Sequence, residues 1–117
     1  MKRFLLLAFL LGAPQFAHAH AMLLKSEPAV GDEVSPAPAE LVLHFSEGVE
    51  PAFSTVVVTD ASGAQVQSGA PKVFAEDRKT LHIGLMPLVA GDYKVEWHAT
   101  SVDTHKTNGH FGFSVKP

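Results

Sequence analysis

Residues 93–99 read Tyr93-Lys94-Val95-Glu96-Trp97-His98-Ala99, a stretch in which apolar and polar side chains alternate without a break. Successive side chains of a β-strand point to opposite faces, so this period of two predicts a strand whose apolar side faces a core. The stretch therefore indicates a β-domain in which this strand is half buried.

Strand-like segments of similar length recur along the chain, separated by turn residues. Residues 41–45 alternate in the same way, and residues 53–59 are rich in β-branched side chains, which favours a buried strand. Further expected strands are residues 22–25, 64–66, 80–85 and 109–115, whereas the polar residues 69–79 are expected to form a loop. About seven short strands, spaced roughly 8–12 residues apart, predict an all-β fold: a small antiparallel sandwich or barrel with Greek-key connections.

The first 19 residues have the three parts of a secretory signal peptide. Lys2 and Arg3 precede an uncharged apolar run, and Ala17-His18-Ala19 places small side chains two apart, as a signal peptidase requires. The run is too short to be a membrane anchor, which needs about 20 apolar residues. We therefore expect residues 1–19 to be removed during export, leaving residues 20–117 as one domain that begins at His20.

Charge and composition narrow the function classes. Without Lys2 and Arg3, seven basic residues face twelve acidic ones, a formal charge of −5, which argues against binding to nucleic acid. The chain contains no cysteine, which excludes a blue-copper electron-transfer site and a structural zinc site of the cysteine type.

The residues that point to a specific chemistry are His20, Asp103 and His105. A histidine at a free N-terminus offers both its α-amine and its imidazole Nδ1, so it can chelate one metal ion. Asp103 and His105 lie two apart, and in an extended segment they would point to the same side. Alone, this pair is more typical of an aspartate that caps its own backbone and of a solvated histidine. Together with His20 it supplies three nitrogens and one oxygen, a set that Cu(II) prefers.

Four segments resemble the CopC family of periplasmic copper-resistance proteins: residues 20–23, 43–47, 91–97 and 101–105. The resemblance implies a cupredoxin-like or immunoglobulin-like β-barrel that binds Cu(II) through His20, Asp103 and His105. It also implies that Glu47 is a weak partner near the metal and that Trp97 lies close to the copper. Residues 59–72 contain no methionine, so the Met-rich Cu(I) site of some members is not expected.

The expected function is that of a periplasmic Cu(II)-binding protein that captures, buffers or delivers one copper ion per chain. The resemblance implies an inner-membrane copper transport protein as a partner, and we expect a monomer without enzymatic activity. Two alternatives stay open: a metal-free immunoglobulin-like assembly module and a copper oxygenase with a histidine brace. The other histidines are expected to be structural or solvated; they are His44, His82, His98 and His110.

Overall fold

The computed structural model describes residues 20–117, which form eight β-strands and one short 3-10 helix. The elements are β1 (Leu23–Glu27), β2 (Glu33–Val34), β3 (Glu40–Phe45), η1 (Pro51–Phe53), β4 (Thr55–Thr59), β5 (Gln67–Phe74), β6 (Asp77–Leu85), β7 (Gly91–Thr100) and β8 (Lys106–Val115). Within residues 20–117, no helix has the length and apolar character needed to cross a membrane. The expected cleavage site at residues 17–19 lies outside the described residues.

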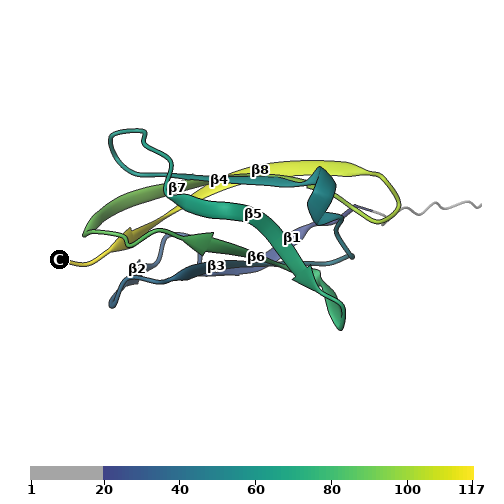
Figure 1. The fold of residues 1–117 in the computed structure, drawn as a ribbon, viewed down its shortest axis with the longest axis horizontal. Coiled ribbons are helices and arrows are strands. Elements are labelled where there is room, and N and C mark those ends of the chain that lie inside the picture. Colours follow the sequence, from purple (N-terminus) through teal and green to yellow (C-terminus); the bar gives the residue numbers. More distant parts are fainter. Residues whose placement is uncertain (1–19) are drawn as a thin grey trace, which may run out of the picture.

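The strands form two four-stranded sheets that pack face to face (Figure 1). The first sheet has the order β1-β3-β6-β5 and the second has the order β2-β8-β7-β4. All pairings are antiparallel except that of β2 with β8. The chain crosses from one sheet to the other after β1, β2, β3, β4 and β6, and the predicted β-sandwich is confirmed.

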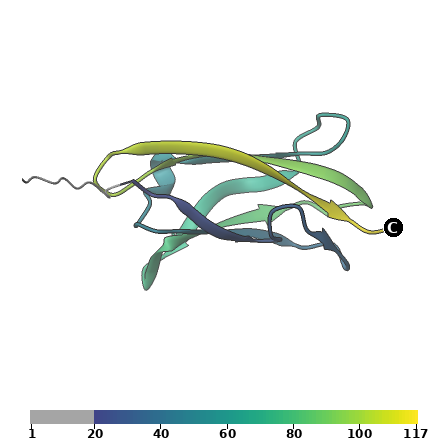
Figure 2. The same cartoon turned by 180° about the vertical axis from the view of Figure 1, so that it is seen from behind.

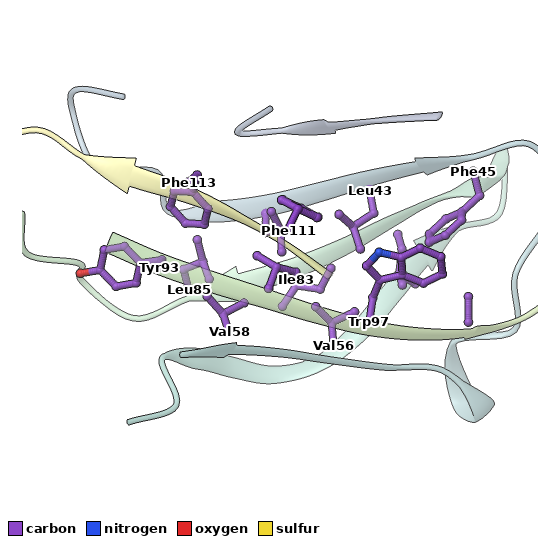
Figure 3. Packing of buried hydrophobic residues seen from close by; sticks show 14 of the residues in the cluster. Leu43, Phe45, Val56, Val58, Ile83, Leu85, Tyr93, Trp97, Phe111 and Phe113 are labelled. Atoms are coloured by element: carbon purple, nitrogen blue, oxygen red, sulfur yellow. The ribbon is translucent and has the colours of Figure 1, made fainter. Parts of the chain in front are cut away.

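The core lies between the sheets because the apolar positions of each strand face inward in alternation (Figure 3). In β7, Tyr93, Val95 and Trp97 are buried while their neighbours are exposed, as the alternation of residues 93–99 predicts. The other strands contribute Leu41, Leu43, Phe45, Val56, Val58, Leu81, Ile83, Leu85, Phe111, Phe113 and Val115.

The Trp97 side chain on β7 packs closely against the main chain of β8. Its register partner is Gly109, and a Cβ placed on that glycine would lie 2.7 Å from the Trp97 ring. The indole also meets Phe45 of the opposite sheet edge-on, with ring centroids 5.3 Å apart. Glycine at position 109 is therefore needed so that the indole can lie flat over β8.

The structure corrects four of the expected elements. Residues 64–66 do not form a strand, because only Gln65 makes an isolated bridge, with Thr59. Residues 69–79 are not a loop, because most of them belong to β5 and β6. Phe53 does not begin a buried strand; it ends η1, and 73% of it is exposed. The last strand begins at Lys106 rather than at Gly109, so β8 starts directly after His105.

One end of the sandwich gathers the segments that carry the candidate ligands. The turn between β7 and β8 and the start of β1 lie at the end opposite the C-terminus, as both views show (Figures 1 and 2). The fold thus brings the segment that begins at His20 to the Asp103–His105 turn.

The packing predicts that a cavity in the centre of β7 destabilises the fold. Val95 is fully buried, so Val95→Ala should lower the free energy of unfolding by about 2–3 kcal/mol through lost burial and the cavity left behind. Val89→Ala is the matched control, because Val89 is 76% exposed and should change stability by less than about 0.5 kcal/mol. Urea unfolding followed by Trp97 fluorescence measures both; equal effects of the two changes would contradict the core assignment.

Candidate metal centre

The β7–β8 turn holds Asp103 and His105 together through hydrogen bonds to a buried serine. Ser101 is 1% exposed, and its hydroxyl donates to Oδ1 of Asp103. The Ser101 main-chain N–H donates to the His105 carbonyl at 2.8 Å, which closes the turn. Thr104 adopts a left-handed conformation with φ of 75°, which is uncommon for a β-branched residue and reverses the chain between the two candidate ligands.

The charge of Asp103 is stabilised by these contacts. The hydrogen bond from Ser101 is the largest cause that lowers the pKa of the Asp103 carboxyl, and desolvation partly opposes it. His105 contributes further, since its Nδ1 lies 3.3 Å from Oδ1 of Asp103. Asp103 is thus an ionised oxygen donor over the whole neutral range, and both side chains are half exposed and accessible to an ion.

His20 lies directly beside His105, although 85 positions separate them in the sequence. Their imidazole rings stack with centroids 4.9 Å apart and an angle of 24° between the ring planes. The structure therefore brings together all three of the expected ligands: His20 contacts His105, and His105 contacts Asp103.

The three side chains are near one another but are not arranged around a common point. Within residues 20–117, no group of three or more His, Asp or Glu side chains is placed so that it could hold a metal ion as it stands. The donor types still fit Cu(II), because two imidazoles and one ionised carboxylate lie next to one another on one exposed surface. Side-chain rearrangement would be needed for all three to bind one ion.

Both neighbours of Glu47 are hydrogen-bonded to segments that contain candidate ligands. Ser46 is hydrogen-bonded to the segment that follows His20, and the Gly48 carbonyl accepts a bond of 3.0 Å from Val102 in the turn. Glu47 is partly buried at this end of the sandwich. These contacts place Glu47 at the same end of the sandwich as the candidate ligands, and its role near a metal stays a prediction.

Trp97 is a core residue first of all, with 7% of its surface exposed. It lies on β7, two residues before Ala99, whose register partner is Thr107 on β8. The indole thus fills the core next to the strand that follows His105.

The remaining histidines lie on outer faces of the sandwich. His98 and His110 are exposed, as expected. His44 is partly buried, and its partners are the side chains of Glu27 and Thr80, each at 3.3 Å. His82 faces outward yet is only 18% exposed, because the Phe74 ring covers it at a centroid distance of 4.4 Å.

Sequence patterns did not reveal the hydroxyl residues that position these ligands. Ser101 carried a weak signal, since a serine two positions before an aspartate often forms a local turn. Ser46 and Thr107 carried none, because their partners are far away in the sequence.

Comparison with known proteins places the chain among copper proteins by similarity. The family model for the CopC domain matches residues 23–116. Copper resistance protein C of Pseudomonas syringae pv. tomato is 42% identical over 106 residues, which cover 86% of this chain and 83% of that protein. Protein YobA of Escherichia coli K12 is also 42% identical, over 84% of this chain and 80% of the relative.

Solved structures agree with the sequence relatives. CopC from Methylosinus trichosporium OB3b superposes with a TM-score of 0.79 at 32% identity, over 84% of this chain and 95% of that one. PcoC, a methionine-rich copper resistance protein from Escherichia coli, has a TM-score of 0.73 at 35% identity, over 84% of this chain and all of the other. With the family model covering residues 23–116 and both fold and sequence in agreement, the chain belongs to the CopC family.

Proposed function

We propose that this chain is an exported Cu(II)-binding protein that starts at His20 and captures, buffers or delivers one copper ion outside the cytoplasm. The observation that carries the proposal is the contact between the His20 and His105 rings, together with the contact between His105 and Asp103. Cleavage before His20 would give this residue a free α-amine. The contact places that amine near His105 and Asp103, which come from a turn far away in the sequence.

The donor chemistry favours Cu(II) over other divalent ions. After a cut before His20, the amine and the imidazole of this residue supply two nitrogens, His105 supplies a third, and Asp103 supplies an ionised oxygen. Among divalent first-row metals, nitrogen-rich sites of this kind bind Cu(II) most tightly. No enzymatic step is proposed, because the residues provide binding groups and no separate catalytic group.

The relatives support copper as the ion. Two similar proteins are named copper resistance protein C, from Pseudomonas syringae and from Escherichia coli, and both match this chain along most of its length. We propose a periplasmic location on the strength of the signal-like sequence of residues 1–19, together with a monomeric state.

A membrane-bound copper transport protein is the partner that we propose. The copper transport protein CutJ of Bacillus subtilis is 31% identical to this chain over 112 residues, which are only 21% of its length. A domain of this kind thus occurs within a longer transport protein, and a separate copy would serve an inner-membrane transporter in the same way.

Loss of the N-terminal ligand should abolish tight copper binding. In a protein that begins at residue 20, His20→Ala removes the imidazole and leaves an amine that can no longer chelate. Removal of groups that only support metal ligands typically costs 10–100-fold in affinity, so loss of a ligand should raise the Kd for Cu(II) by at least about 100-fold. Competition titration against a copper chelator, with Trp97 fluorescence as a readout, measures this.

Two further variants make the result specific. His98→Ala is the matched control, because His98 is exposed on the outer face of β7 and should leave the Kd unchanged. Acetylation of the His20 amine keeps the imidazole but converts the amine into an amide, and it should also weaken binding. Copper binding that is indifferent to both changes at the chain start would refute the proposal and favour the metal-free assembly module.

Copper affinity should fall steeply as the pH falls. Free α-amines and imidazoles take up protons near pH 7.7–8.0 and 6.5, and these protons compete with the metal. Asp103 does not add to this effect, because its lowered pKa keeps the carboxylate ionised. Between pH 7.5 and pH 5 we expect the apparent Kd to rise at least about 100-fold.

Chelator competition at a series of pH values measures this dependence. The His105→Ala variant should show a shallower slope, because one competing proton is lost with the imidazole. An affinity that stays constant over this range would rule out the assigned nitrogen donors.

A further inference from the structure

The segment that follows the chain start lies between strands of the two different sheets. Ala21 is fully buried, and its carbonyl accepts a hydrogen bond of 2.8 Å from the Thr107 hydroxyl on β8. On the other side, Ser46, at the end of β3, is bonded to Met22 and His20. The chain start thus joins the first sheet to the second.

Ser46 makes two kinds of bond to this segment. Its main-chain N–H donates to the Met22 carbonyl at 2.9 Å, which extends the pairing of β1 with β3. Its hydroxyl accepts from the Met22 N–H at 2.9 Å and donates to the His20 carbonyl at 3.2 Å. Only the hydroxyl bonds would be lost on substitution by alanine, and the strand pairing would remain.

Thr107 connects the segment that contains His20 to the strand that follows Asp103 and His105. It lies two residues after His105 on β8, and its hydroxyl holds the residue directly after His20. This bond therefore limits the distance between the main chain of one histidine and that of the other. The stacking of the two rings at 4.9 Å is the result expected from such a connection.

A chain end is normally poorly ordered unless contacts hold it in place. A ligand on a mobile end has to be ordered when the metal binds, and that cost lowers affinity. Contacts that order the end beforehand remove the cost, so residues that never touch the metal can raise its affinity.

We propose that Thr107 and Ser46 form a hydroxyl clamp that positions the chain start for copper. Both are positioning residues: neither binds the ion, and both act through the main chain around Ala21. This inference rests on the proposed function, since it concerns the affinity of the same site. Thr107 is the more informative of the two, because it connects the segment next to His20 to the strand that directly follows His105.

The test compares two substitutions at position 107 in the protein that begins at His20. Thr107→Val keeps the shape and the β-branch but removes the hydroxyl, whereas Thr107→Ser keeps the hydroxyl. Loss of the clamp bond should raise the Kd for Cu(II) about tenfold in Thr107→Val, within the range seen when a group that supports a metal ligand is removed. Thr107→Ser should stay within about threefold of the unsubstituted protein, since its hydroxyl can still donate to the Ala21 carbonyl.

A double-mutant cycle separates positioning from a general loss of stability. In the unsubstituted protein, His105→Ala should weaken binding strongly, because both histidines engage one ion. In the Thr107→Val background the same change should weaken binding less, because the two histidines are no longer held together. Urea unfolding of the metal-free variants shows whether the fold is retained, and a destabilised fold alone would leave the effect of His105→Ala unchanged.

Ser46→Ala is an independent second variant in case Thr107→Val fails to fold. It removes two hydroxyl bonds, keeps the main-chain pairing and should also weaken copper binding. If binding depends on His20 but is unchanged in both hydroxyl variants, the clamp is wrong and the proposed function stands. If the unsubstituted protein binds copper no better than His20→Ala, the proposed function itself fails.

Discussion

The burial of Ala21 between the two sheets is the contact on which the candidate metal centre depends. Its side chain is fully enclosed, so the chain can enter the sandwich at this point in only one register. Its carbonyl is paired with a hydroxyl of the second sheet, which avoids the cost of an unpaired polar group. Since His20 precedes this residue directly, its distance from the β7–β8 turn follows from the core packing.

The strands that face the core were predictable because their residues alternate, whereas the edge strand β5 was not. Within Gln67–Phe74 no residue is fully buried, so the segment has no apolar period, and it contains Gly69 and Pro71, which usually indicate a loop. A proline is tolerated in a strand at the edge of a sheet, where β5 lies. Phe53 was wrongly predicted to begin a buried strand because it is apolar. The sequence alone does not distinguish an apolar side chain at the surface from a buried one.

Asp103 and His105 are close together, as predicted, but the cause differs from the one that the sequence suggested. Two residues in an extended segment would point to the same side, but the segment is a turn in which Thr104 is left-handed. Their proximity comes from Ser101, which bonds Asp103 through its hydroxyl and His105 through its main chain. The arrival of His20 at the same turn could not be derived from spacing, because it depends on a hydrogen bond across 86 residues.

The contacts that place His20 all lie on the C-terminal side of the proposed cleavage site. They involve the His20 carbonyl, Ala21 and Met22, so they do not require a free chain end and are already made in the uncleaved chain. In the uncleaved chain the nitrogen of His20 is an amide and is a poor ligand near neutral pH. Cleavage before His20 would turn it into an α-ammonium group, whose proton a metal can displace near neutral pH. Removal of the signal peptide would therefore create the last copper donor by changing one functional group, while the scaffold that positions it stays as it was. Under the proposed function, tight copper binding would therefore depend on the cleavage before His20.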